Sequence, residues 1–410
     1  MLRCQRSPIE NNDIMNILMK TLTPLCLVLL LPFAACAEGE IPTYQNPVIK
    51  YSLPDPSVIR AKDGNFYLYA TEDTHNVPIY RSKDLVTWRY AGTAFTDATR
   101  PMDMVPDGGI WAPDINYIDG RYVLYYSKST WGGSWEAGIG VAWSDKPNGG
   151  FHEAHKLFVS NEIGIENCID PFFMQDDDGR NYLFFGSFHD IYAIELTADG
   201  LNLMEGAQPT KIAGGLIEAT MIYKHDDYYY LVGSTGTCCE GAKSTYRLVM
   251  SRSKSLLGPY VDRNGRSAIG DNFSPLLNKS PYVYGPGHCS RFVTDDAGQT
   301  WMIYHGYMAD DVDAGRVVYL DKIQWGTGGW PQVQSMRPST QAQVPLFGEA
   351  ASISSVTSSN EGFTQVYDIL GRRVNSESHP ALNSTLNTLP FPRLYILRDA
   401  TSGKSIKVVR

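Results

Sequence analysis

Residues 63–71 read Asp-Gly-Asn-Phe-Tyr-Leu-Tyr-Ala-Thr, a tight turn followed by a strand rich in aromatic residues. Glycine after aspartate is typical of a hairpin, because glycine tolerates the positive φ that a tight turn needs. Four more stretches repeat this pattern, and they begin at Asp119, Asp178, Asp226 and Ala297. A recurring unit of this size, built from short strands, is typical of a β-propeller. The sequence therefore predicts an all-β fold, a five-bladed β-propeller.

A second pattern precedes these turns. Polar residues stand eight positions before four of the turn residues, in the pairs Asp55 and Asp63, Asp170 and Asp178, Glu218 and Asp226, and His288 and Asp296. Asp114 stands only five positions before its turn, so it is not strictly equivalent. An aspartate before a strand is commonly a turn residue, but four polar residues in one register favour a shared site. Because innermost strands line the channel of a propeller, we expect these side chains to meet at its mouth.

Several motifs follow one another in order along the chain. They are Asp55-Pro-Ser, Trp111-Ala-Pro-Asp-Ile, Asn167-Cys-Ile-Asp-Pro, Ile217-Glu-Ala, Cys238-Cys-Glu-Gly-Ala-Lys-Ser-Thr-Tyr246 and Gly285-Pro-Gly-His. From about Asn46 to Pro331 the chain thereby resembles glycoside hydrolase family 43. The Cys-Cys segment favours the α-1,5-arabinanase branch of that family.

The resemblance implies a role for each polar residue. It makes Asp55 the general base, Glu218 the general acid, and Asp170 the residue that orients the acid and raises its pKa. His288 is the position that it assigns to a structural calcium ion or a water cluster. Two positions depart from the family pattern: Thr220 stands where proline is usual, and no tyrosine follows His305.

These roles suit the cleavage of a glycosidic bond. One carboxylic acid protonates the leaving oxygen, while a carboxylate activates water at the anomeric carbon. In an inverting enzyme the two groups stand roughly 6.5–9.5 Å apart to admit that water. A nearby anion such as Asp170 would help Glu218 to keep its proton. The resemblance thus implies inverting hydrolysis of α-1,5-L-arabinofuranosidic linkages of arabinan.

Substrate binding is expected from three further residues. Trp111 fits two roles equally well, since its ring could stack on a pentose or pack in the core. Asn167 and Ser187 offer hydrogen bonds from neighbouring strand ends. Calcium prefers oxygen donors, so an ion near His288 would be structural, and the alternative is a histidine held by water alone. Tyr246 is expected to pack in the core.

Other functions fit parts of the same pattern. An exo-acting α-L-arabinofuranosidase or a β-xylosidase of the same family would carry the same three carboxylates. A non-catalytic carbohydrate-binding propeller predicts that one of Asp55, Asp170 and Glu218 is replaced, yet all three are present. The formal net charge of −9 argues against a nucleic-acid partner, which needs a basic surface. We therefore expect a polysaccharide or oligosaccharide partner; the oligomeric state stays open.

The ends of the chain predict export. Residues 1–37 are interpreted as a signal peptide, with an apolar run from Leu25 that is too short for a stable membrane span. The protein would be secreted or periplasmic, or alternatively lipid-anchored at Cys36. The propeller is expected over residues 41–349 and a Ser-rich linker over 350–362. Residues 363–410 predict a small β domain of three short strands, which resembles a type IX secretion sorting domain.

Four cysteines remain after the predicted leader: Cys168, Cys238, Cys239 and Cys289. Their spacing matches no metal motif. A bond between neighbouring cysteines is rare, so the sequence predicts buried thiols.

Overall fold

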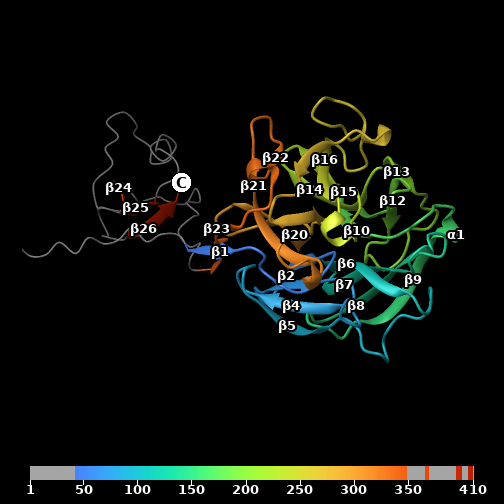
Figure 1. The fold of residues 1–410 in the computed structure, drawn as a ribbon. Coiled ribbons are helices and arrows are strands. Elements are labelled where there is room, and N and C mark those ends of the chain that lie inside the picture. The colour runs from blue at the N-terminus through green and yellow to red at the C-terminus, as the bar shows by residue number, and fades with distance from the viewer. Residues whose placement is uncertain (1–41, 349–364, 369–393, 399–404, 410) are drawn as a thin grey trace, which may run out of the picture. The chain divides into compact units, whose positions relative to one another are not determined.

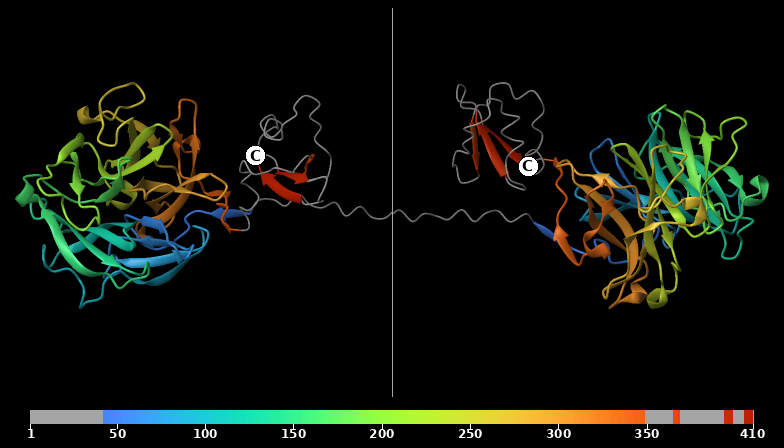
Figure 2. Two further views of the ribbon diagram at one scale, coloured as in Figure 1. Left: turned by 180° about the vertical axis from the view of Figure 1, so that it is seen from behind. Right: turned by 90° about the horizontal axis from the view of Figure 1, so that it is seen from above.

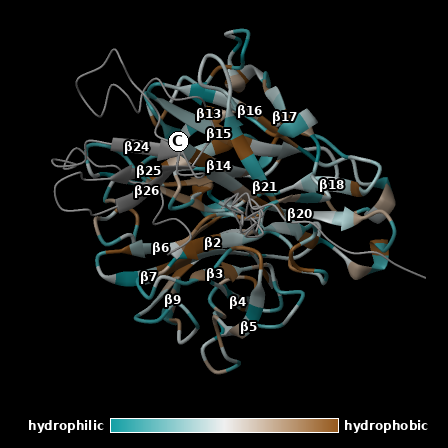
Figure 3. Cartoon of the chain, turned by 90° about the vertical axis from the view of Figure 1, so that its left-hand side faces the viewer, coloured by the Kyte–Doolittle hydropathy of each residue, from teal (hydrophilic) through white to brown (hydrophobic). Residues whose placement is uncertain are grey.

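The computed structural model describes residues 42–348, 365–368, 394–398 and 405–409. Within residues 42–348, the five sheets of the repeat, labelled by strand in Figure 1, are arranged radially about a common centre, as Figure 3 shows. Figure 2 shows these sheets from behind and from above. One short α-helix, α1 (Ser160–Ile163), and four 3-10 turns are the helical segments of the described residues. The predicted all-β, five-bladed propeller is confirmed.

The blades are built alike. In the first four blades the strands pair antiparallel in chain order, and in Figure 3 strands β2 to β5 follow one another from the centre outward. In the fifth blade, β18 and β19 both pair with β20. Blade 1 comprises β2 (Ser57–Arg60), β3 (Phe66–Tyr69), β4 (Pro78–Ser82) and β5 (Trp88–Thr93), and blade 2 comprises β6 (Gly109–Ile118), β7 (Arg121–Ser129), β8 (Gly138–Ser144) and β9 (His152–Val159). Blade 3 comprises β10 (Phe172–Gln175), β11 (Asn181–Phe185), β12 (Ile191–Leu196) and β13 (Thr210–Ala213), and blade 4 comprises β14 (Glu218–His225), β15 (Tyr228–Thr235), β16 (Arg247–Ser253) and β17 (Ser274–Leu277). Blade 5 comprises β18 (Val283–Gly287), β19 (Val293–Thr294), β20 (Thr300–Met308), β21 (Val317–Trp325) and β22 (Pro331–Gln332).

All five predicted turns lie between paired strands. In blade 2 both turn residues take positive φ, with Asp119 at 44° and Gly120 at 83°. Blade 4 lacks the glycine, and there Asp226 adopts a φ of 50°. In blade 5 the turn joins β19 to β20, because the innermost strand is interrupted between β18 and β19.

Aromatic residues fill the spaces between neighbouring blades. Between blades 1 and 2, Tyr69 meets Phe151 edge-on at 6.0 Å, and Phe95 meets Tyr126 at 5.6 Å. All four rings are fully buried. Each such pair contributes roughly 0.5–1.5 kcal/mol beyond its burial. The aromatic strands of the repeat therefore serve mainly as packing surfaces between blades.

The ring is closed by the first described residues. Strand β1 (Thr43–Gln45) pairs antiparallel with β23 (Gln341–Gln343). Val48 and Ile49 then hydrogen bond with Val318 of blade 5, before the chain enters blade 1. This closure joins segments almost 300 residues apart. Asn46 adds two hydrogen bonds to it: its Nδ2 donates to the Leu320 carbonyl, and its Oδ1 accepts from the Leu320 N–H.

Near the C-terminus, three strands form a separate antiparallel sheet in the order β24 (Gln365–Asp368), β25 (Leu394–Arg398) and β26 (Ser405–Val409). They coincide with the three strands that the sequence predicted. The predicted signal peptide and the Ser-rich linker lie outside the described residues, and the sorting-domain resemblance stays a prediction. Among the described residues, no helix is long and apolar enough to cross a membrane.

Each blade has a non-glycine residue with a positive φ in or beside its innermost strand: before β2 and β10, inside β6 and β14, and just after β18. We call these five residues the axial bends; each has a positive φ, unusual outside glycine. They are Asp55, Ala112, Asp170, Ala219 and His288, with φ of 55°, 43°, 57°, 54° and 47°. The sequence register was therefore wrong for Glu218, because Ala219 occupies the equivalent place. The pairing of β14 with β15 shifts between Glu218 and Met221, and a local spacing rule cannot detect this bulge.

The backbone N–H of every axial bend donates to a side chain. In four blades the acceptor comes from the second strand of the preceding blade or the residues just after it. These bonds are Asp55 to His305 Nδ1 (3.0 Å), Ala112 to Thr71 Oγ1 (2.8 Å), Asp170 to Ser127 Oγ (2.9 Å) and His288 to Ser234 Oγ (2.9 Å). Blade 3 has Gly186 at the corresponding place, which offers no side chain. There Ala219 donates to Asp170 Oδ2 instead, at 3.0 Å.

Candidate active site

A cavity of about 780 Å³ opens at the mouth of the channel. All seven residues that the sequence singled out line this cavity: Asp55, Trp111, Asn167, Asp170, Ser187, Glu218 and His288. The axial bends recur at this convergence, because several of the lining residues lie at or directly before one of them. Asp55, Asp170 and His288 occupy bends themselves, and Glu218 directly precedes one.

Asp55 is surrounded by cationic and hydroxyl groups. Its Oδ1 lies 3.0 Å from Arg316 Nη1 and 3.1 Å from His288 Nδ1, and its Oδ2 accepts from Thr71 Oγ1 at 2.5 Å. Burial alone would raise the pKa of this carboxyl group, but the charges of Arg316 and His288 outweigh burial. The pKa of Asp55 is held well below its usual range, so the carboxylate stays ionised.

His305 contacts the backbone of Asp55 and was not among the site residues predicted from the sequence. Its side chain is fully buried, and its Nδ1 accepts the Asp55 N–H. The ring proton is therefore assigned to Nε2, which has no partner among the described side chains and backbone. Burial, followed by the charge of Arg316, lowers the pKa of His305 to about 4. His305 is thus a neutral acceptor at neutral pH.

Glu218 is held by two hydroxyl groups. Ser187 Oγ donates to Oε2 at 2.6 Å and Tyr246 Oη donates to Oε1 at 2.7 Å. Burial raises the pKa of Glu218, and the charge of Asp55 adds to this rise, while the two hydrogen bonds oppose it. Asp55 and Glu218 therefore have pKa shifts in opposite directions within one cavity. Tyr246 packs in the core as predicted, but it also positions this carboxyl group.

Asp170 reaches Glu218 through the backbone. Its Oδ2 accepts from the Ala219 N–H, which belongs to the peptide group that follows Glu218. Burial raises the pKa of Asp170 to about 7, with the charges of Glu218 and Asp55 contributing and His288 opposing. The main cause of the raised Glu218 pKa is burial, rather than the Asp170 charge that the sequence analysis invoked.

His288 lies beside Asp55 at the axis. Burial lowers its pKa, but the surrounding carboxylates, Asp55 first, outweigh burial and raise it. No group of three or more His, Cys, Asp or Glu side chains among the described residues is arranged to hold a metal ion. Calcium takes six to eight oxygen ligands, so an ion beside His288 would draw most of them from water. The calcium ion stays a prediction.

The outer wall of the cavity carries aromatic rings. Trp111 packs at 5.7 Å from Trp131, whose side chain is 80% exposed. Trp131 was not singled out from the sequence, although a tryptophan before Gly132-Gly133 between two strands is a usable signal. Asn167 Nδ2 donates to the Ser187 carbonyl at 3.1 Å. Sugar binding by Trp111, Asn167 and Ser187 stays a prediction.

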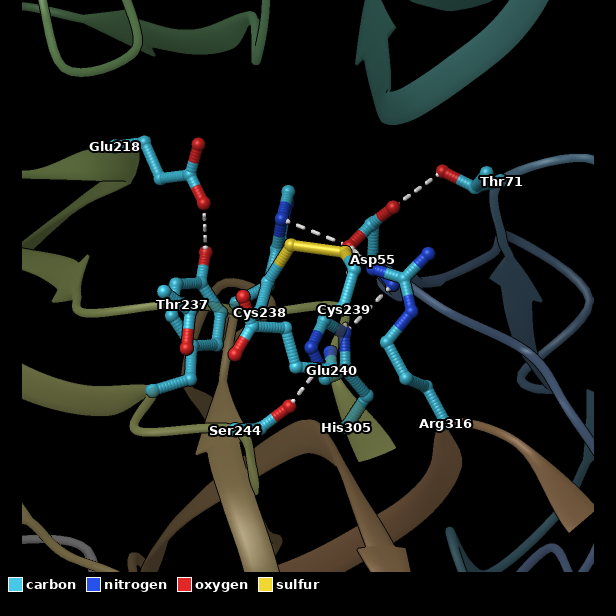
Figure 4. Close-up of a disulfide and its surroundings, with 12 residues drawn as sticks. Asp55, Thr71, Glu218, Thr237, Cys238, Cys239, Glu240, Ser244, His305 and Arg316 are labelled. Carbon is cyan, nitrogen blue, oxygen red and sulfur yellow. Dashed lines mark hydrogen bonds and ion pairs between the residues drawn. A yellow bond between two sulfur atoms is a disulfide. The ribbon is translucent and has the colours of Figure 1, made fainter. Parts of the chain in front are cut away.

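Cys238 and Cys239 form a disulfide, so the prediction of buried thiols is wrong for this pair. Both residues lie in the loop between β15 and β16, on the cavity wall (Figure 4). A general rarity of bonds between neighbours could not foresee how this particular loop turns. Cys168 and Cys289 are buried free thiols, as predicted.

Comparison with known proteins agrees with this geometry. Residues 44–331 match the profile of the glycosyl hydrolases family 43. The chain is 32% identical to an extracellular exo-α-(1→5)-L-arabinofuranosidase of Cellvibrio japonicus, over 75% of this chain and 90% of that protein. It is also 32% identical to an extracellular endo-α-(1→5)-L-arabinanase of Bacillus subtilis, over 68% of this chain and 87% of that protein.

Among solved structures, the α-L-arabinanase of Cellvibrio cellulosa in complex with arabinohexaose aligns with a TM-score of 0.63. That alignment has 33% identity and covers 68% of this chain and 95% of the arabinanase. The family profile spans the whole propeller, including the segments that supply Asp55, Asp170 and Glu218. The chain therefore belongs to glycosyl hydrolase family 43 and is a glycoside hydrolase.

Proposed function

We propose that this protein cleaves α-1,5-L-arabinofuranosidic linkages within arabinan by an inverting mechanism. The observation that carries the proposal is the pair of oppositely shifted carboxyl groups, Asp55 and Glu218, on the wall of one cavity. The two relatives are an exo-α-(1→5)-L-arabinofuranosidase and an endo-α-(1→5)-L-arabinanase, and this supports α-1,5-linked arabinose as the substrate.

Asp55 acts as the general base. Arg316 and His288 keep its carboxylate ionised, and it takes a proton from the water that attacks the anomeric carbon. His305 fixes the Asp55 backbone, so the carboxylate does not have to reorganise during the reaction.

Glu218 acts as the general acid. Burial favours its protonated form, and proton transfer to the leaving oxygen prevents the departure of an alkoxide. Asp170 holds the peptide that follows Glu218, while Ser187 and Tyr246 fix the two carboxyl oxygens. Asp170 is therefore assigned as the residue that orients the acid.

The product profile on debranched arabinan tests the substrate and the mode of attack. Internal cleavage predicts a ladder of oligosaccharides at early times, resolved by chromatography. A single product from the start would place the cut at a chain end, as in the exo-acting relative. Hydrolysis of β-xylosides with arabinan left intact would replace the proposed substrate by xylose-based chains.

The stereochemistry is tested separately. Inversion predicts that proton NMR first detects the β anomer of the released arabinose end, before mutarotation produces the α anomer. Immediate appearance of the α anomer would show retention and would contradict the roles of Asp55 and Glu218.

We also propose that the protein acts outside the cytoplasm, in keeping with the extracellular relatives. The N-terminal sequence of the exported protein tests cleavage after Ala37 against lipid attachment at Cys36. Thermal unfolding tests the structural calcium ion: chelation should lower the Tm and added calcium should restore it. An unchanged Tm would show that no calcium ion stabilises the fold.

A further inference from the structure

The Cys238–Cys239 disulfide lies on the wall of the cavity that holds the three carboxyl groups. Cys239 is exposed and Cys238 is half-buried, in contrast to the fully enclosed Cys168 and Cys289. Figure 4 shows the disulfide in the same close-up as Asp55 and Glu218, and both cysteines line the cavity that these carboxyl groups line. An exposed disulfide in this place faces whatever occupies the cavity.

The loop that carries the disulfide is held in one conformation by its own hydrogen bonds. Thr237 and Thr245 bond through their hydroxyl groups at 3.1 Å and through backbone N–H groups, which closes the base of the loop. Glu240 N–H donates to Ser244 Oγ at 2.9 Å and spans the loop just beyond the disulfide. The disulfide is therefore presented on a fixed support.

The chemistry of a disulfide suits the apolar face of a sugar. A disulfide has no hydrogen-bond donor, whereas each thiol formed from it carries a weak S–H donor and is free to rotate. Trp111 and Trp131 of blade 2 offer an aromatic surface to the same cavity, and blade 3 separates blade 2 from blade 4. A sugar in the cavity would thus meet an apolar surface from two separate blades.

We propose that the Cys238–Cys239 disulfide contacts the bound sugar chain as an apolar platform, and that its reduction weakens substrate binding. The inference rests on the proposed function, to which it adds a specificity-determining contact and a sensitivity to thiol reagents. Reduction by a dithiol breaks the S–S bond, adds two electrons and two protons to give two thiols, and oxidises the dithiol to its cyclic disulfide.

The test measures kcat and KM of the full-length enzyme on arabino-oligosaccharides, before and after treatment with dithiothreitol. Mass spectrometry of the tryptic peptide that ends at Lys243 verifies that the pair is reduced. We expect KM to rise about three- to tenfold, with kcat changed less than about twofold. The matched variant C238S/C239S should reproduce the high KM and should not respond to dithiothreitol.

Two results would overturn the proposal. One is an unchanged KM in enzyme shown to be fully reduced and folded by circular dichroism. The other is a fall in kcat at constant KM, which would place the effect on Tyr246 and Glu218 rather than on substrate contact. Wild-type enzyme that fails to cleave arabinan refutes the proposed function before any reductant is added. The ratio of KM values is then measured on the substrate that the enzyme does cleave.

Discussion

The mouth of the channel and its interior both bury carboxyl groups near an arginine, yet their surroundings differ. Asp55, at the mouth, lines the cavity and faces Arg316. Asp114, two residues beyond its axial bend, is not part of that wall. Its oxygens accept from Ser57 Oγ at 3.2 Å, Asn116 Nδ2 at 2.8 Å and the Phe173 N–H at 2.7 Å.

The arginines differ in the same way. Arg291 is partly buried and donates to the Phe173 carbonyl at 2.7 Å, and its guanidinium lies over the Phe172 ring at 4.6 Å. Together Asp114 and Arg291 join residues of blades 1, 2, 3 and 5. A strand-start carboxylate therefore becomes structural when protein donors occupy its oxygens. It is available for catalysis when it faces a cavity.

Replacement of Glu218, at the mouth of the channel, should lower activity strongly with little effect on stability. Glu218→Gln keeps an acceptor for one of the Ser187 and Tyr246 hydroxyls, and its NH2 group can donate to the other. The amide has no transferable proton, so kcat on arabinan should fall about 10²- to 10⁴-fold. The Tm should change by only about a few degrees. Steady-state kinetics and thermal unfolding check both values, and near wild-type activity would remove Glu218 from the acid role.

Replacement of Asp114 should have the opposite outcome. Asp114→Ala leaves the three donors of that carboxylate without their acceptor and removes the negative charge near the partly buried Arg291, which should cost about 3–5 kcal/mol of unfolding free energy. Activity per folded molecule should remain within about threefold, because the cavity wall is untouched. Denaturant unfolding and active-site-normalised rates are the measurements. A stable but inactive variant would move Asp114 into the catalytic group.

His305 should show a smaller effect on activity alone. His305→Leu removes the acceptor of the Asp55 N–H, and we expect kcat to fall about tenfold. His305→Asn should recover most of this loss, because its amide oxygen can replace Nδ1. If the Leu variant matches the wild type in kcat and in the acidic limb of its pH–rate profile, His305 is only a packing residue.

The smallest expected effect concerns stability against pH. The pKa of Asp170 in the folded protein is raised to about 7, so its protonated form is favoured by folding. That contribution is complete below the unfolded pKa and is lost as pH rises through about 7. Asp170→Asn should therefore gain about a few degrees of Tm relative to wild type at pH 8 but not at pH 4. An equal difference at both pH values would contradict the shifted pKa.

The sequence predicted the features that depend on neighbouring residues. The five turns follow from Asp-Gly pairs and their relatives, and the axial polar residues follow from their distance to those turns. The sequence could not predict the bulge beside Glu218, because a bulge is set by pairing with another strand. It also missed His305 and Arg316, which lie about 250 residues or more from Asp55 in the chain.

The central claim is that Asp55 and Glu218 act as base and acid on the same linkage. The most direct test compares Asp55→Asn and Glu218→Gln on an arabino-oligosaccharide and on its dinitrophenyl glycoside, whose leaving group needs no proton. Glu218→Gln should lose about 10²-fold or more on the natural linkage but less than about tenfold on the aryl glycoside, whereas Asp55→Asn should lose similarly on both. Equal losses of both variants on both substrates would contradict the assignment.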